Sequence, residues 1–392
     1  MTWPLEDDAA WRPVRQHWSL PEGLTYLNHG SFGLPTRAVI QVQGQYLDRA
    51  AAEPMDFFVR ELEPELIAAR DRLADFVGAD RGNLVFVENA TYGMNVVAES
   101  VGLAAGDEVV MTTHEYGAVF RIWHRKCEEV GARVVEAKLP PRLESSDEIV
   151  DAVLAALTPK TKLVVFSHIT SATAMKLPAE RITRAVQDRG VAVCIDGPHA
   201  PGILPLELDA LGCEYYTAVC HKWLSAAHGT GFLYVHPQVQ STVRPSLLSW
   251  GRVQPAVPET WQDEFTWTGT RDMATYLSLP AALDFLAEFG WETLRRRTHY
   301  LARYARESIA NLTGHDALIP DEEDWYGAMI TMPLRNDGRP WVEFRDTLRS
   351  RFQIEALVYD VNEQRFIRTS CYLYNTKDDV DHLVEALRVL LY

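Results

Sequence analysis

Short runs of apolar, mostly β-branched residues alternate with longer amphipathic stretches through the middle of the chain. Runs of this kind predict strands, and the stretches between them predict helices. We expect strands at residues 84–87, 108–113, 163–168, 191–196 and 232–235. Because these runs are apolar on both alternating faces, they predict a mainly parallel sheet that is buried on both sides.

Helical patterns flank this region. They cover residues 36–52 and 61–77, with Pro54 between them, and residues 91–103. A long helical region begins near Met273, and residues 23–35 are turn-rich and irregular. From about Tyr326 the pattern becomes strand, helix, strand, strand, helix, which predicts a smaller C-terminal unit.

The fold class is therefore α/β, with a large domain around the mainly parallel sheet and a smaller α+β C-terminal domain. We place the large domain at residues 31–285 and the small domain at 286–392, and we expect residues 1–30 to pack on the small domain. In sheets of this type the chemistry gathers at the carboxyl ends of the strands.

Composition narrows the class of protein. The chain has 392 residues and a net charge of −16, which argues against nucleic acid or an anionic membrane as a partner. The five cysteines are scattered, as in a protein that keeps its thiols reduced. The sequence shows no signal peptide and no apolar stretch of the ~20 residues that span a bilayer. We expect a cytoplasmic protein that acts on a small molecule.

Two residues suggest the chemistry. Asp196 ends the strand VAVCID, and Lys222 lies farther on, after a strand-like segment, in the semi-apolar stretch AVCHKWL. Taken singly, Asp196 is best explained as a turn cap, and Lys222 as a surface lysine. Together, in this order, they fit pyridoxal phosphate: the lysine forms an imine with the aldehyde, and the carboxylate keeps the pyridine nitrogen protonated.

A third element fits the same cofactor. The segment ENATYGMN follows a strand and opens a helix, so its free N–H groups and the Thr91 hydroxyl could bind a phosphate. Thr91 as a plain N-cap is an equal alternative. A metal site at His199, His221 and His228 has no supporting ligand spacing, and we expect none.

Seven segments, in order, resemble a known family: TYLNHGSFGLP, AEPMDFFVREL, FSHITSATA, DGPHAPG, CHKWL, WTGTRD and FIRTSCYLYNTKDDVDHLVEAL. The set resembles class V aminotransferase-like enzymes of pyridoxal-phosphate fold type I, and within them the isopenicillin N epimerase-like branch. The resemblance covers nearly the whole chain. It implies pyridoxal 5′-phosphate as cofactor, a large domain with a seven-stranded type of sheet, and an amino-acid substrate.

The resemblance also implies a role for each site residue. Lys222 would carry the cofactor and act as acid and base at Cα, and Asp196 would pair with the ring nitrogen. Arg368 would bind the substrate α-carboxylate, and Thr270 would reach the phosphate of the other subunit in a homodimer. The remaining expected contacts are His199 to the ring hydroxyl, Tyr116 on the cofactor face, Ala90, Thr91 and His221 at the phosphate, and Asn28 and His29 at the substrate.

The reaction type stays open at this point, because one fold hosts many reactions. Sulfur-mobilising desulfurases of this class need a loop cysteine after the lysine, and residues 311–361 contain none. The first hypothesis is a C–S β-lyase or decarboxylative deaminase of an S-substituted cysteine in natural-product (antibiotic) biosynthesis. The alternatives are an isopenicillin N-type epimerase, a class V aminotransferase and a non-catalytic protein, the last disfavoured by Lys222 and Asp196.

Overall fold

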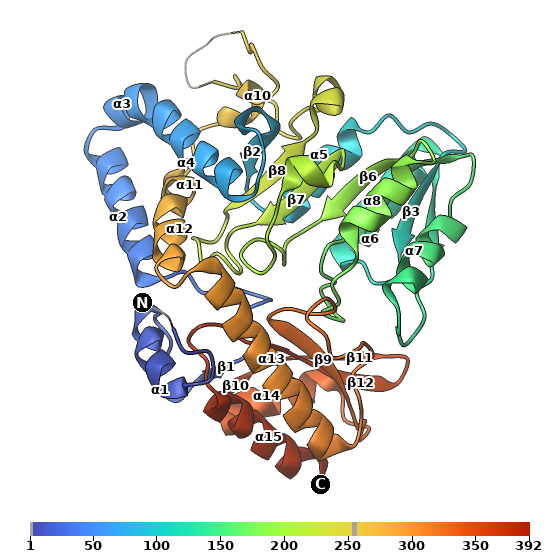
Figure 1. The fold of residues 1–392 in the computed structure, drawn as a ribbon. Helices are drawn as coiled ribbons and strands as arrows, with labels where there is room; N and C mark the ends of the chain where they lie inside the picture. The colour runs from blue at the N-terminus through green and yellow to red at the C-terminus, as the bar shows by residue number, and fades with distance from the viewer. Residues whose placement is uncertain (1–2, 253–256) are drawn as a thin grey trace.

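The computed structural model describes residues 3–252 and 257–392, and its centre is a seven-stranded sheet (Figure 1). The strand order is β2-β8-β7-β6-β5-β3-β4. Strand β8 pairs antiparallel with β2 and with β7, and the other four pairs are parallel. The strands are β2 (Leu84–Val87), β3 (Glu108–Thr112), β4 (Arg133–Ala137), β5 (Thr161–Ser167), β6 (Ala192–Asp196), β7 (Tyr215–Val219) and β8 (Gly231–Val235).

This sheet confirms the predicted fold class, and the five predicted strands match β2, β3, β5, β6 and β8 to within two residues at each end. Strand β4 was not predicted. It pairs only with β3 at one edge of the sheet, and its residues Arg133 and Glu136 are exposed. An edge strand of this kind lacks the continuous apolar run that marks a strand buried on both faces.

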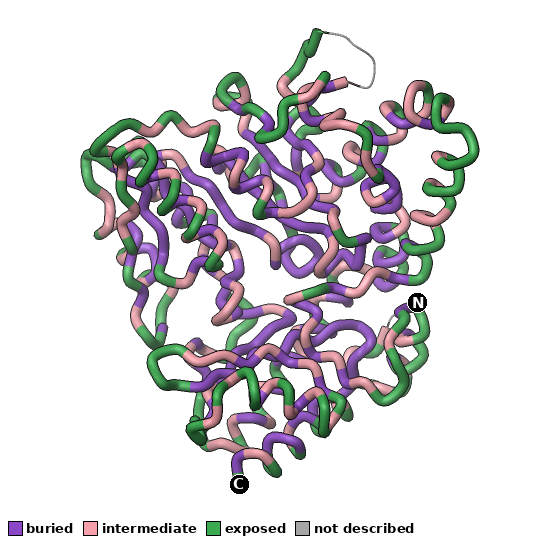
Figure 2. The backbone as a smooth tube through the Cα atoms, turned by 180° about the vertical axis from the view of Figure 1, so that it is seen from behind, coloured by how far each residue is buried: buried purple, intermediate pink, exposed green. Residues whose placement is uncertain are grey.

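Alternation along the strands explains how both faces are covered. Val109 and Met111 of β3 pack into one core with α5 (Ala90–Ser100) and α6 (Gly117–Val130). Val110, between them, packs into a larger core on the opposite face. That second core includes residues of α7 (Ser146–Ala155), α8 (Ala179–Gln187), α12 (Leu279–Ala287) and α13 (Trp291–Thr313). The buried strands therefore run through the middle of the upper part of the molecule (Figure 2).

A second sheet lies in the C-terminal part and has the order β11-β12-β9 (Figure 1). The chain order from β9 onward is the predicted strand, helix, strand, strand, helix, with a two-residue strand β10 added. The elements are β9 (Met329–Leu334), α14 (Trp341–Phe352), β10 (Ile354–Glu355), β11 (Leu357–Val361), β12 (Gln364–Ser370) and α15 (Lys377–Leu391).

The N-terminal segment contacts this C-terminal part. Strand β1 (Thr25–Tyr26) pairs in parallel with β10, and the guanidinium of Arg297 on α13 forms a buried ion pair with Asp8. Residues 1–2 of the predicted N-terminal segment lie outside the described residues. The division at residues 30 and 285 stays a prediction.

The remaining helices include the two predicted near the N-terminus. Helix α2 begins one residue after Thr36, whose hydroxyl accepts a hydrogen bond from the Val39 N–H and so caps the helix. Pro54 opens a short helix, as proline does at a first helical position. These and the short helices are α1 (Asp8–Trp11), α2 (Arg37–Ala52), α3 (Pro54–Asp56), α4 (Leu62–Phe76), α9 (Leu208–Leu211), α10 (Asp263–Thr266) and α11 (Ala274–Leu277).

Helix α5 lies unusually close to strand β7. The Thr217 hydroxyl donates to the Ala90 carbonyl at 3.2 Å, and a Cβ added at Gly93 would lie 2.2 Å from Thr217 Oγ1. A side chain at position 93 would therefore collide with Thr217, and either the Thr217 hydroxyl or the helix would have to move. The contact fixes where the N-terminus of α5 points.

We expect Gly93→Ala to destabilise the protein by about 1–3 kcal/mol, the usual cost of forcing an extra methyl into a packed interior. Urea unfolding of the cofactor-free protein measures this. Gly44→Ala is the control, because Gly44 lies within α2 and an added Cβ there meets nothing within 4 Å. That variant should be neutral or gain up to ~1 kcal/mol. Equal stability of the two variants would contradict the assigned packing of α5.

Candidate active site

Most of the predicted site residues converge on one cavity of about 420 Å³. Its walls include the last residues of β5, β6 and β7 from the large sheet, and residues of β11 and β12 from the small sheet. The cavity thus lies at the carboxyl ends of the central strands and between the two sheets. The predicted residues that line it are Ala90, Thr91, Tyr116, Asp196, His199, His221, Lys222 and Arg368.

Lys222 follows β7 on a tight loop, and its Nζ lies 3.2 Å from His199 Nε2. Burial, together with the positive charge of Arg368, lowers the pKa of Lys222 to about 7, although Asp196 acts in the opposite direction. An amine with such a pKa is largely unprotonated just above neutral pH. It can therefore act as a nucleophile or as a base.

Asp196 ends β6 and is 3% exposed. No side chain or backbone N–H among the described residues donates to its carboxylate. Burial and the nearby carboxylate of Glu115 raise the pKa of Asp196 to about 7, against the effect of Lys222. A buried carboxyl group that faces a cavity without a protein partner is suited to a cationic group of a ligand.

Glu115 was not singled out from the sequence, although it precedes Tyr116 in HEYGAVF. Its carboxylate accepts hydrogen bonds from the hydroxyls of Thr112 and Ser167. Burial raises its pKa to about 7. Ser167 is the residue of β5 that lies beside Asp196 of β6, so Glu115 lies behind the cavity wall as a second buried carboxyl group.

The N-terminus of α5 opens onto the cavity. The Asn89 side chain caps this helix by accepting from the Tyr92 N–H, and no hydrogen bond of the described residues uses the N–H groups of Ala90 and Thr91. Free N–H groups at the start of a helix favour an anion such as phosphate. His221 donates through Nδ1 to the Thr230 carbonyl, and burial lowers its pKa to about 4. Its neutral ring would thus present an acceptor nitrogen, so that His221 would donate to a phosphate only when protonated.

Arg368 projects from β12 and is 1% exposed. Its guanidinium donates to the Ser171 carbonyl, to Ser31 Oγ at 2.7 Å and to Asn28 Oδ1 at 3.3 Å. A guanidinium has five N–H groups, and these contacts use at most three. Nε is buried without a partner among the described residues. Arg368 therefore keeps donor capacity for a carboxylate in the cavity.

Three predicted residues do not line the cavity. Asn28 lies behind Arg368 and accepts from it. His29 is fully buried, with Nδ1 at 2.9 Å from the Tyr374 hydroxyl and Nε2 at 2.9 Å from the Lys222 carbonyl. Thr270 is exposed. Within this chain, Asn28 and His29 are therefore placed to support Arg368 and Lys222 from behind.

Tyr116, by contrast, is half exposed at the cavity. It precedes α6, and its hydroxyl has no hydrogen-bond partner among the described residues. Ser31 and Ser171, which bind Arg368, were not singled out individually. Both belong to segments already noted in the sequence, SFGLP and FSHITSATA, but a lone serine gives no signal of its own.

These features fit pyridoxal phosphate. A buried carboxyl group without a partner matches a ring nitrogen, an amine of lowered pKa matches an aldehyde, and an open helix N-terminus matches a phosphate. Lys222, Asp196, and Ala90 with Thr91 would hold the three parts of the cofactor. His199, adjacent to Lys222, would lie near the ring.

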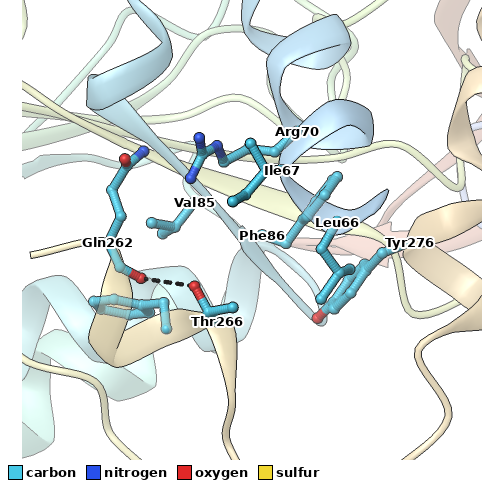
Figure 3. A pocket seen from close by; sticks show the side chains of 9 residues that line it. Leu66, Ile67, Arg70, Val85, Phe86, Gln262, Thr266 and Tyr276 are labelled. Atoms are coloured by element: carbon cyan, nitrogen blue, oxygen red, sulfur yellow. Dashed lines mark hydrogen bonds between the residues drawn. The ribbon is translucent and has the colours of Figure 1, made fainter. Parts of the chain in front are cut away.

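Four other hollows of the described residues are lined by none of the predicted site residues. A hollow between Leu66, Val85, Phe86 and Tyr276 has a volume of about 30 Å³, which is the share of one water molecule in the liquid (Figure 3). The described part of the chain contains no group of three or more His, Cys, Asp or Glu side chains that could hold a metal ion. In the same residues, no helix has the length and apolar character needed to cross a bilayer.

Comparisons with known proteins agree with the geometry. The family model for class V aminotransferases matches residues 26–383. Isopenicillin N epimerase of Amycolatopsis lactamdurans is 38% identical over 97% of this chain and 99% of its own length. Putative L-cysteine desulfhydrase 1 of Oryza sativa subsp. japonica is 28% identical over 94% of this chain and 83% of its own.

A solved structure shares the fold. The complex of the cystine C–S lyase C-DES with cysteine persulfide superimposes with a TM-score of 0.84 and 20% identity, covering 94% of this chain and 98% of that one. The family match extends over most of the chain, including every residue that lines the cavity. The chain therefore belongs to the class V aminotransferase family of pyridoxal-phosphate-dependent enzymes, and pyridoxal 5′-phosphate is its cofactor.

Proposed function

We propose that this enzyme removes the α-proton of a free amino acid, with Lys222 as the base and Arg368 as the ligand of the α-carboxylate. The observation that carries this proposal is the convergence of both side chains on one cavity, with the pKa of Lys222 lowered to about 7. A base with a pKa near the working pH is efficient in proton transfer. Bound pyridoxal phosphate supplies the electron withdrawal that makes the α-proton acidic.

For the step that follows, we propose elimination from an S-substituted cysteine. Lys222 takes the proton from Cα, and the Cβ–S bond breaks with its electron pair on sulfur. The thiolate takes up a proton and leaves as a thiol, and water then hydrolyses the remaining three-carbon fragment to pyruvate and ammonia. Similarity to the rice protein named as a putative L-cysteine desulfhydrase supports a cysteine-type substrate. The cavity also has an apolar wall on which a sulfur substituent could pack, formed by Phe32, Val119, Ile169 and Leu357.

The cysteines support release of a thiol over transfer of sulfur to the protein. All five are buried thiols, and none lines the cavity. Burial raises the pKa of Cys371 to about 12, so this thiol is a poor nucleophile. Sulfur that leaves the substrate has no protein thiolate to receive it within the described site.

Epimerisation is the second candidate, and a specific observation favours it. An epimerase needs a second proton donor besides Lys222, and the free hydroxyl of Tyr116 lines the same cavity. The 38% identity with an isopenicillin N epimerase supports the same reaction. Aminotransfer would begin with the same proton removal. Decarboxylation is disfavoured, since tight binding of the carboxylate by Arg368 stabilises the ground state of that step.

We also propose a homodimer in which Thr270 reaches the phosphate of the partner subunit. Thr270 is exposed and does not line the cavity of its own chain. The nearby segment that includes Leu247, Leu248 and Trp250 exposes large apolar side chains, which a second copy could cover. The cytoplasmic location stays a prediction.

Product analysis in D₂O separates the candidates. With S-substituted L-cysteines we expect pyruvate and a thiol in equal amounts, and no product from Lys222→Ala. Tyr116→Phe should keep most of this activity, because elimination needs only one base. An epimerase would instead invert amino acids with deuterium at Cα and would lose inversion roughly 100-fold or more in Tyr116→Phe, since a general acid typically contributes at least that much.

The outcomes are distinct for the other reactions. Carbon dioxide with an aldehyde would indicate decarboxylative deamination, and a keto acid with one equivalent of aminated cofactor would indicate aminotransfer. Decarboxylation alone, or no reaction with any free amino acid, would contradict the proposed removal of the α-proton.

Arg368 gives a second prediction. Removing one partner of a buried charged hydrogen bond costs about 2–5 kcal/mol, so Arg368→Ala should lose roughly 30-fold or more in kcat/KM. Arg368→Lys keeps the charge but loses the planar donor set, and its KM should rise markedly. Steady-state kinetics on the reactive amino acid test this. The control is Arg335→Ala, because Arg335 is exposed at the end of the neighbouring strand β9. Unchanged kinetics in both Arg368 variants would contradict the carboxylate assignment.

A further inference from the structure

Lys222 stands at the end of a hydrogen-bond chain that begins at the next residue. The indole Nε1–H of Trp223 donates to His199 Nδ1 at 3.3 Å, and His199 Nε2 lies 3.2 Å from Lys222 Nζ. Trp223 is 1% exposed and His199 is 2% exposed, so water does not compete for these hydrogen bonds. Among the described residues, His199 alone connects the indole of Trp223 to the amine of Lys222 by hydrogen bonds.

The direction of these hydrogen bonds follows from the chemistry of the groups. An indole nitrogen can only donate, so Nδ1 of His199 must accept. Burial, with the positive charges of Lys222 and Arg368, holds the pKa of His199 well below its usual range, so its ring is neutral. A neutral imidazole carries one proton, and that proton therefore lies on Nε2. The N–H at Nε2 faces Lys222, whose amine must then accept and be unprotonated.

We propose that Trp223 is a positioning residue that fixes the Nε2–H tautomer of His199 and thereby keeps Lys222 in its nucleophilic, neutral form. This inference rests on the proposed role of Lys222 as the residue that reacts with the cofactor aldehyde and removes the α-proton. The same Nε2–H would remain as a donor toward the cofactor ring once Lys222 has reacted.

The backbone around Trp223 is held in a way that suits this role. The Tyr372 hydroxyl donates to the Trp223 carbonyl at 2.6 Å, and His29 stacks on the Tyr372 ring with centroids 3.8 Å apart. Burial lowers the pKa of His29 to about 3, so its single proton must serve the Lys222 carbonyl, which can only accept, and Nδ1 must accept from Tyr374. His29 and Tyr372 thus donate hydrogen bonds to the carbonyl groups of Lys222 and Trp223 and hold them in place.

Other charges also face Lys222. Arg368 from β12 and Asp196 from β6 act on its amine, and His221 precedes it in the chain. Trp223→Phe leaves all of these in place and removes the indole donor, together with part of the ring that packs against His29 and Tyr372. Nδ1 is then free to carry the proton, and Nε2 becomes an acceptor that favours the ammonium form of Lys222. The pKa of Lys222 should therefore rise.

The test uses cofactor-free protein and measures, by absorbance, the rate at which it captures pyridoxal phosphate between pH 5 and 9. Capture requires the neutral amine, so the wild-type rate should be half-maximal near pH 7. In Trp223→Phe we expect the midpoint to move up by about one pH unit, which slows capture at pH 6 by roughly ten-fold. The control is Trp18→Phe, because Trp18 is equally buried and contacts Tyr372, but its N–H donates to the Leu34 carbonyl and Ser225 Oγ.

A double-mutant cycle shows whether the effect passes through His199. In a His199→Asn background, Trp223→Phe should produce no further shift of the midpoint. An equal shift in both backgrounds, an unshifted midpoint in Trp223→Phe, or an equal shift in Trp18→Phe would overturn the inference. If wild-type protein captures no cofactor, the proposed role of Lys222 fails as well, and this outcome is distinguishable from an unshifted profile.

A measurement on wild-type protein avoids any folding defect of the variants. The ¹⁵N chemical shifts of His199 in labelled, cofactor-free protein distinguish the two neutral tautomers. A protonated Nε2 supports the inference, and a protonated Nδ1 overturns it.

Discussion

Removal of water from ionisable groups between the two sheets is the constraint on which this active site depends. Lys222 lies on the loop that follows β7 of the large sheet and Arg368 on β12 of the small one, and both side chains line the cavity between the sheets. Two positive charges that lie close together in a poorly hydrated space destabilise each other's protonated form. Lys222 is the group that loses its proton. The reactivity of Lys222 is thus a property of how the sheets meet.

Burial shifts the pKa of the carboxyl groups in the opposite direction, upward. Asp196 and Glu115 lie on the same side of the cavity, and burial raises the pKa of each to about 7. Glu115 is satisfied by two hydroxyl donors, whereas Asp196 faces the cavity without one. A cationic ring nitrogen would supply the partner that Asp196 lacks. Cofactor binding should therefore stabilise the folded protein, since the ligand supplies a partner that the chain does not.

Much of this arrangement could be predicted from the sequence, because the buried strands are continuous apolar runs and the chemistry follows their carboxyl ends. Asp196 directly ends such a run, and Lys222 follows another. What the sequence does not contain is the direction of a side chain in a loop. Glu115 and Tyr116 are neighbours, yet one points behind the wall and the other into the cavity.

His29 is a second residue whose side-chain direction could not be predicted from the sequence. Its segment was expected at the substrate, and it does lie beside Lys222, but the ring is stacked on Tyr372 and bonded to the Lys222 carbonyl. Only the tertiary contacts of Tyr372 and Tyr374, which are distant in the chain, decide that orientation. Those tyrosines belong to an aromatic cluster that also packs Trp18 and Trp223. Such a cluster buries apolar surface next to ionisable groups, whose own burial costs free energy. It also fixes the orientation of rings that must donate their hydrogen bonds in one direction. The aromatic layer therefore holds the loop, and the ionisable residues proposed for the chemistry lie in an adjacent layer in front of it.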